Sequence, residues 1–146
     1  MSATRTRALA LFSSVLLTVL GGACSHGLFS PGPDQLRSAS EDFEKSLRFQ
    51  DYGGAAQFVV PARRSAFVAA RRKEANDLTI TDMEVIDVQM APDGQKAIVL
   101  SRMRWVKLPS VTEVTGEVQA RWEILNNGWL LVSLAGSPFP ELAPAP

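Results

Sequence analysis

The apolar residues of this chain are spaced in two different ways. Between residues 34 and 76 they recur every three or four positions, and from residue 78 onward they alternate with polar residues. The first spacing is typical of helices with one buried side, and the second of strands with one buried face. The pattern therefore predicts helices followed by strands.

The first expected helix covers residues 34–52. Pro33 suits its first turn, where the missing N–H costs nothing, and Gly53-Gly54 should end it because glycine adopts the left-handed cap without strain. Residues 55–60 form either a helical turn or an extended piece, and Pro61 is expected to open a second helix that runs to Asn76. The stripe on the first helix consists of Leu36, Ala39, Phe43 and Leu47.

Charged residues are expected on the exposed sides of both helices. Glu41–Lys45 and Glu44–Arg48 have the spacing of ion pairs along the first helix. The second helix carries a basic group that is either a solvated cap at its negative end or a contact with anionic lipid or a partner. This group consists of Arg63, Arg64, Arg71, Arg72 and Lys73.

Four strands are expected over residues 78–90, 96–108, 111–125 and 129–134, with an irregularity at 81–84. The segment Ala91-Pro92-Asp93-Gly94 has the composition of a tight turn, and Asn126-Asn127-Gly128 is typical of a two-residue hairpin. Short connections between consecutive strands favour an antiparallel meander. The fold class is therefore α+β, with the N-terminal helices packed on a curved four-stranded antiparallel sheet in one domain over residues 34–134. A proline-rich tail, residues 135–146, should be exposed.

The first 24 residues have the layout of an export signal. Arg5 and Arg7 precede an uncharged run over residues 8–20, and small residues then lead to Cys24, the single cysteine of the chain. The run is shorter than the roughly 20 apolar residues that span a bilayer, which disfavours an ordinary membrane anchor, although a short uncleaved anchor stays an alternative. We expect an exported protein.

The segment Leu20-Gly21-Gly22-Ala23-Cys24 resembles the lipobox of bacterial lipoproteins. The resemblance implies a signal peptide over residues 1–23 and acylation of Cys24. The proline and glycine content of residues 25–33 independently predicts a flexible linker, so residues 24–33 are expected to join the lipid to the domain. The lipobox resemblance also implies a membrane partner through the N-terminal lipid, in the cell envelope. Ser25 after the cysteine implies the outer membrane, facing the periplasm, in a Gram-negative organism. Gly21 departs from the aliphatic residue usual at that place, which leaves ordinary cleavage after Ala23 as the alternative.

The composition excludes several kinds of chemistry. Basic and acidic residues are equal in number, 15 of each, so no nucleic-acid partner is indicated. The single histidine, His26, lies in the linker, and the sequence has neither metal-ligand spacing nor a phosphate-binding glycine loop. We therefore predict no catalytic residue, no metal and no cofactor.

The order of elements is similar to the NTF2-like (cystatin-like) superfamily. The resemblance rests on residues 51–56 at the end of the first helix, on a short helical stretch at residues 61–64, and on strands that close at Gly128-Trp129. It implies a sheet that curls into a cone around the first helix. Because that superfamily includes isomerases, dehydratases, binding proteins and scaffolds, the resemblance alone does not choose a function.

Two sets of residues could serve a pocket. Asp82, Glu84 and Asp87 on the first strand are either an inward general base or solvated acids of a strand edge. A pocket in the cone would be lined by large side chains, which could equally form the core. These candidates are Phe43, Met103, Trp105, Trp122 and Trp129.

Three functions follow from these observations. The first is an envelope lipoprotein with a non-catalytic module that docks another protein, by the sheet edge or by the basic helix. The second is a carrier of an apolar small molecule in the cone. The third is an isomerase or dehydratase of the NTF2-like kind. The absence of histidine and cysteine chemistry disfavours the third without excluding it.

Overall fold

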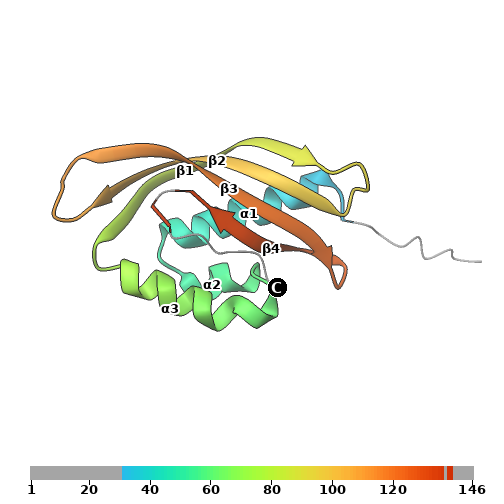
Figure 1. Cartoon of the computed structure of the whole chain (residues 1–146), viewed down its shortest axis with the longest axis horizontal. Coiled ribbons are helices and arrows are strands. Elements are labelled where there is room, and N and C mark those ends of the chain that lie inside the picture. Colours follow the sequence, from blue (N-terminus) through green and yellow to red (C-terminus); the bar gives the residue numbers. More distant parts are fainter. Residues whose placement is uncertain (1–30, 137, 140–146) are drawn as a thin grey trace, which may run out of the picture.

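The structure is a computed structural model that describes residues 31–136 and 138–139. The helices precede the strands, as the hydrophobic pattern predicts (Figure 1). The elements are α1 (Pro33–Arg48), α2 (Tyr52–Gln57), the 3-10 turn η1 (Pro61–Arg63), α3 (Arg64–Glu74), β1 (Leu78–Met90), β2 (Lys96–Lys107), β3 (Glu113–Leu125) and β4 (Gly128–Ala135).

The first helix, α1, begins at Pro33 and carries an acidic residue, Asp34, in its first turn and basic residues in its last turn. Both placements suit the helix dipole. Its buried side contains two polar residues among the apolar ones, which the predicted stripe did not include. The buried residues are Leu36, Ser40, Phe43, Glu44 and Leu47.

The predicted end of this helix was wrong. The helix stops at Arg48, and Gln50 adopts the left-handed φ of 58° that we expected of a glycine. Gly53 and Gly54 lie inside α2, where the Gly54 N–H donates to the capping carboxylate of Asp51 at 2.9 Å. A Cβ at Gly54 would collide with that carboxylate. The glycine therefore allows a helix start, because it lets the cap approach closely.

The four strands form one antiparallel sheet in the order β1-β2-β3-β4. β1 has two register shifts, one at Ile80/Asp82 inside the predicted irregular region and one at Val85/Asp87. Asn126 and Asn127 both take positive φ, as the predicted two-residue hairpin requires. The alternation along β2 is strict, and its buried residues are Ala97, Val99, Ser101, Met103 and Trp105.

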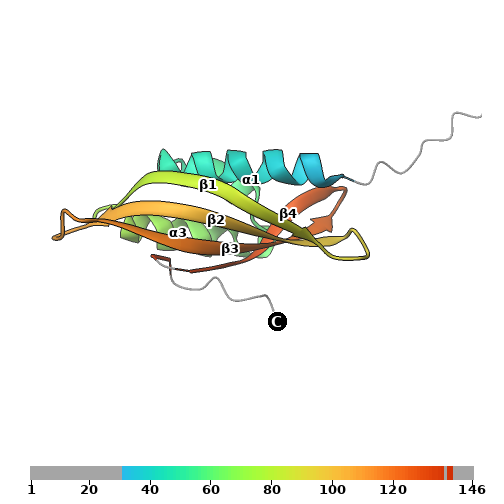
Figure 2. The same ribbon diagram turned by 90° about the horizontal axis from the view of Figure 1, so that it is seen from above.

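The helices cover one face of this sheet. α1 runs along β1 and touches β4, α2 packs on α1, and α3 packs on α2 (Figures 1 and 2). The other edge of the sheet is bordered by residues 58–60, where Val60 and Phe58 exchange backbone hydrogen bonds with Leu131. β1 is thus the edge strand that pairs on one side only among the described residues.

The C-terminal tail departs from the prediction of an exposed segment. Phe139 is only 6% exposed and joins the core, where its ring lies 4.1 Å from the Arg71 guanidinium carbon. Burial of a phenylalanine side chain contributes about 1.5–3 kcal/mol, which offsets part of the entropy lost when the residues before it are ordered. Residues 137 and 140–146, like the predicted signal peptide and most of the predicted linker, lie outside the described residues. Within the described part of the chain, no helix is long and apolar enough to cross a membrane.

Candidate functional site

The five residues expected to line a pocket are placed in the core. Trp122 and Met103 are fully buried, and Phe43, Trp105 and Trp129 are at most 5% exposed. The Phe43 ring meets Trp122 edge to face, with centroids 5.9 Å apart. Such a pair contributes about 0.5–1.5 kcal/mol beyond its buried area. These side chains fill the space between α1 and the sheet.

The basic residues of the second helix do not form one surface. Arg71 is 4% exposed, so the prediction that it lies on the solvated side was wrong. Arg64 donates to the backbone carbonyls of Val59 and Gln57 at 2.9 and 3.0 Å and thereby closes the end of α2. Arg63 is half-buried, whereas Arg72 and Lys73 are exposed. Two of the five cations therefore serve the fold.

Arg71 is held by a carboxylate and two aromatic rings. Its Nη1 lies 3.2 Å from Glu74 Oε2, and Phe139 and Phe67 cover the guanidinium. Burial lowers the pKa of Arg71 and raises the pKa of Glu74, while their mutual attraction opposes both shifts. The apolar spacing of the helix predicted that Arg71 faces solvent, because the sequence of the helix does not show that Phe139 packs over this position. The cluster is a structural ion pair.

Glu44 is the candidate site residue that the sequence analysis missed. It is 5% exposed on the sheet side of α1, and its carboxyl is hydrogen-bonded to the hydroxyl of Ser101 on β2. Burial raises the pKa of Glu44 to about 7, although the hydrogen bond from Ser101 opposes the shift. The predicted exposed pair with Arg48 is therefore wrong, because Glu44 faces the sheet. Glu44 follows Leu36 by eight residues, a spacing that puts both side chains on the same side of a helix, and this spacing could have revealed the burial of Glu44.

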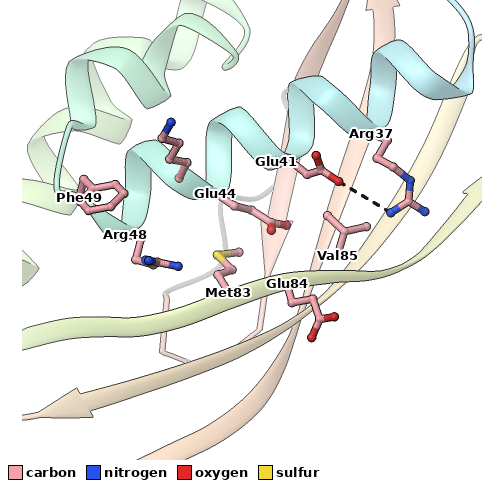
Figure 3. A pocket seen from close by; sticks show the side chains of 9 residues that line it. Arg37, Glu41, Glu44, Arg48, Phe49, Met83, Glu84 and Val85 are labelled. Atoms are coloured by element: carbon pink, nitrogen blue, oxygen red, sulfur yellow. Dashed lines mark ion pairs between the residues drawn. The ribbon is translucent and has the colours of Figure 1, made fainter.

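A groove lies between α1 and β1 and reaches Glu44. It has a volume of about 640 Å³. Arg37, Glu41 and Arg48 project from the helix beside it (Figure 3). Its lining also includes Lys45 from the helix and Met83, Glu84 and Val85 from the strand. The Glu44 side chain points from the helix toward Met83. A carboxyl that is half protonated near neutral pH thus borders a groove of the size that holds small ligands.

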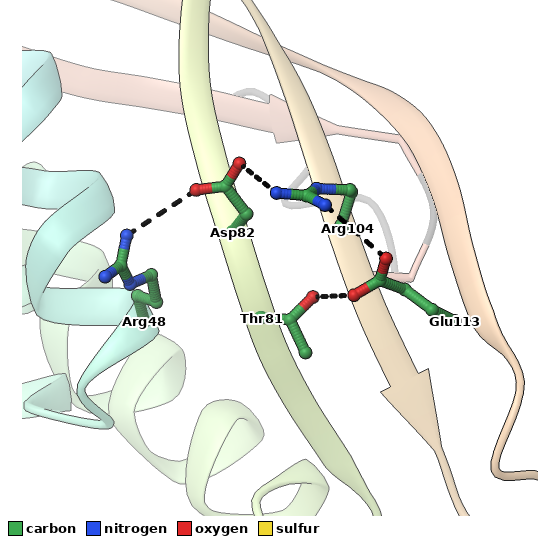
Figure 4. Close-up of polar contacts among 5 residues, drawn as sticks. All are labelled: Arg48, Thr81, Asp82, Arg104 and Glu113. Carbon is green, nitrogen blue, oxygen red and sulfur yellow. Dashed lines mark hydrogen bonds and ion pairs between the residues drawn. The ribbon is translucent and has the colours of Figure 1, made fainter.

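The carboxylates of β1 are surface groups. Asp82 accepts a hydrogen bond from Arg104 at 2.8 Å and also pairs with Arg48 (Figure 4). The bond from Arg104 holds the pKa of Asp82 below its usual range, which makes it a weak base. Glu84 and Asp87 are exposed. The arrangement fits the interpretation of solvated acids at a strand edge.

Glu113 extends this polar network across the sheet. It accepts a hydrogen bond from the Thr81 hydroxyl at 2.6 Å and pairs with Arg104 (Figure 4). Exposed ion pairs of this kind each contribute little stability. The network joins α1, β1, β2 and β3 on the outside of the domain. No group of three or more metal-ligating side chains occurs among the described residues.

Exposed apolar side chains gather at the connection between β2 and β3. Val111 is 86% exposed, Leu108 is 56% exposed and Val114 is 44% exposed. This connection is the end of the sheet farthest from the start of α1 (Figures 1 and 2). Clustered exposed apolar residues are a common feature of interaction surfaces.

Comparison with known proteins identifies the fold. The sequence matches no protein-family model and no curated protein. A domain of unknown function with a cystatin-like fold from Nostoc punctiforme has a TM-score of 0.59 at 12% identity, over 73% of this chain and 76% of that chain. A ketosteroid isomerase-like protein from Erwinia carotovora atroseptica has a TM-score of 0.56 at 12% identity, over 76% and 96%.

An NTF2-like protein from Cytophaga hutchinsonii gives the same result. Its TM-score is 0.56 at 8% identity, over 73% of this chain and 97% of that chain. Identities this low carry no information about activity. The helices followed by a four-stranded antiparallel sheet, and the solved structures that match them, show that the chain has the NTF2-like, cystatin-like fold.

Proposed function

We propose that the protein is an envelope lipoprotein whose NTF2-like domain is a non-catalytic module that docks another protein. The observation that carries this proposal is the filled interior. Phe43, Met103 and Trp122, where a cone pocket was expected, pack in the core. The larger hollows found in the described residues are open grooves on the surface, and the one between α1 and β1 is lined mainly by charged side chains. Such surfaces suit a protein partner better than an apolar ligand.

The proposed tether and the apolar cluster lie at opposite ends of the domain. The carbonyl of Gly32 accepts a hydrogen bond from Trp129 Nε1 at 3.3 Å, so the chain enters beside the β3–β4 hairpin. The connection between β2 and β3, which carries Leu108 and Val111, lies at the other end of the sheet (Figure 1). A domain held by lipid at Cys24 would therefore present these residues away from the bilayer, where a protein partner can reach them.

The tether is tested with the full-length protein in a bacterial host. Acylation of Cys24 should place the protein in the membrane fraction and make its processing sensitive to globomycin. The Cys24→Ala variant should lose both properties. Unchanged membrane association and processing in that variant would overturn the lipoprotein assignment.

Docking is tested by placing a photoreactive residue at position 111 of the tethered protein in living cells, with position 93 in the opposite turn as control. We expect a discrete cross-linked protein from position 111 only, which the Leu108→Glu variant reduces. A stoichiometric small molecule recovered with the purified protein, without any cross-linked protein, would contradict the proposal and favour the carrier.

A second function is favoured by Glu44. A buried carboxyl with a pKa of about 7 beside a groove can give and take a proton near neutral pH, as acid–base enzymes require. One structural neighbour is described as ketosteroid isomerase-like. Deuterium uptake from D₂O by a simple enolisable ketone, seen with the wild type and lost in Glu44→Gln, would support this function. Uptake equal to the uncatalysed rate would count against it.

A further inference from the structure

Part of β3 is a free strand edge, although β3 lies inside the sheet. β4 pairs with Gln119–Leu125 and leaves the earlier residues of β3 unpaired on that side (Figure 1). The chain turns away at Gly136, which has a φ of 119° and where a Cβ would collide with the carbonyl oxygen of Glu117. Among the described residues, Glu113–Gly116 therefore have β2 as their only neighbouring strand, and this segment is called the free β3 edge below.

The free β3 edge is open to solvent. Glu113, Val114 and Thr115 are exposed, and so is the connection before them from Leu108 to Thr112. The first helix, α1, packs against β1 and β4 instead. An open edge offers backbone N–H and C=O groups to an added strand without displacing a helix.

Val114 is the exposed end of an apolar row that crosses the sheet. It pairs with Trp105 on β2, which pairs with Ile80 on β1. Trp105 is buried and Ile80 is half-buried, whereas Val114 is 44% exposed. An apolar side chain opposite Val114 on an added strand would cover it as Trp105 is covered.

We propose that the free β3 edge pairs antiparallel with the same edge of a second copy of this chain, so that two four-stranded sheets join into one. The inference rests on the proposed docking function, because it uses the same end of the sheet, and it names the partner. In a symmetric pair of this kind each copy offers the same residues to the other. The edge must therefore complement itself.

The charges of the edge select one register. Because the two-fold axis keeps the same sheet face on both copies, one residue lies opposite its own copy. An axis at Glu113 opposes two glutamates, and an axis at Thr115 opposes Glu113 and Glu117. An axis at Gly116 needs residues that β4 already pairs. An axis at Val114 places valine opposite valine and Glu113 opposite Thr115, so it alone avoids opposed like charges, which destabilise cross-strand pairs.

The pairing is short and suits proteins that share a membrane. An edge of this length forms few main-chain hydrogen bonds, so the domain should dimerise weakly when it is free in solution. Two copies held by lipid at Cys24 in one bilayer would have a much higher effective concentration. The paired ends would lie away from the hairpin beside which each chain enters the domain.

A cysteine at position 114 tests the register. Opposite residues of an antiparallel pair have Cα atoms about 4.5–5.5 Å apart, which a disulfide can span. The Val114→Cys variant of the full-length protein in membranes should form a covalent dimer under mild oxidation. In the same register two copies of residue 115 lie about 8 Å apart, so Thr115→Cys should give about fivefold less dimer. The wild type controls for Cys24, the single native cysteine.

Two further substitutions at position 114 test the complementarity without a cross-link. Val114→Glu would oppose two carboxylates across the axis, whereas Val114→Thr keeps the branched shape and adds no charge. Energy transfer between copies labelled at the C-terminus, in lipid vesicles, measures association. The association constant should fall about tenfold in Val114→Glu and change by less than about threefold in Val114→Thr. Circular dichroism checks that both variants fold.

The dimer is rejected if Val114→Cys gives no covalent dimer, if Thr115→Cys gives as much, or if the wild type and Val114→Glu show equal energy transfer. The photo-cross-linking at position 111 keeps this result separate from the docking function, because it identifies the captured protein. Capture of a different protein together with these failures would keep docking and reject the second copy. Absence of any captured protein would reject docking as well.

Discussion

Glu44 and Arg71 are both ionisable side chains buried in this domain, at 5% and 4% exposure, and the fold accommodates them differently. Arg71 keeps its charge, because Glu74 lies beside it and Phe139 covers it. Glu44 accepts a hydrogen bond from the hydroxyl of Ser101 and binds a proton at a pKa of about 7. One site is neutralised by a counterion and the other by protonation.

This difference separates a structural site from a responsive one. An arginine stays charged throughout the neutral pH range, so the charge of Arg71 does not change in that range. Glu44 changes its charge in that range and borders the groove between α1 and β1. Changes of pH therefore act on the α1 side of the domain, whereas substitutions at Arg71 act on its folding.

The largest expected effect is that of Arg71→Ala. The substitution leaves the Glu74 carboxylate without its cation and removes the packing of the guanidinium against Phe139. The free energy of unfolding should fall by about 4 kcal/mol in urea denaturation. Arg72→Ala, on the exposed side of the same helix, should change it by less than about 0.5 kcal/mol. Equal losses in the two variants would mean that Arg71 is not held by the cluster.

The next effect is a pH dependence that Glu44 confers. Between pH 4.5 and about 7 the unfolded chain releases the Glu44 proton while the folded protein keeps it. The folded state then binds more protons, so stability is full below pH 4.5 and falls as the pH rises to 7. The loss should reach about 3 kcal/mol relative to Glu44→Gln. Parallel pH profiles of the two proteins in urea denaturation would refute this assignment.

The smallest expected effect is that of Ser101→Ala, which tests whether the Ser101 hydrogen bond influences the pKa of Glu44. The Ser101 hydrogen bond lowers the pKa of the carboxyl, so its removal should raise that pKa further. The variant should also lose about 1–2 kcal/mol of stability at acidic pH, because a buried carboxyl loses its partner. A carbon NMR titration of Glu44 measures the pKa directly. A lower pKa in the variant would contradict the proposed role of Ser101.

The architecture could be predicted because each element has a local cause. The alternation of β2, the hairpin at Asn126-Asn127 and the helix start at Pro33 follow from side-chain spacing and backbone preferences over a few residues. The helix end at Arg48 was missed, since two glycines looked like a stop and instead accommodate the Asp51 cap. The presence of a glycine in the sequence does not by itself indicate whether a helix end or a close contact requires it.

The candidate site depended on contacts between distant parts of the chain. Sequence spacing shows that Glu44 could face either side of its helix, and only the position of Ser101, 57 residues later, makes it a buried acid. The sequence of α3 likewise predicts a solvated Arg71, because the side chain that buries it, Phe139, comes from a distant part of the chain. By itself the sequence determined the helices, the strands and their order, because those follow from local periodicity. The tertiary structure decided which charges are buried, because burial depends on what packs against them.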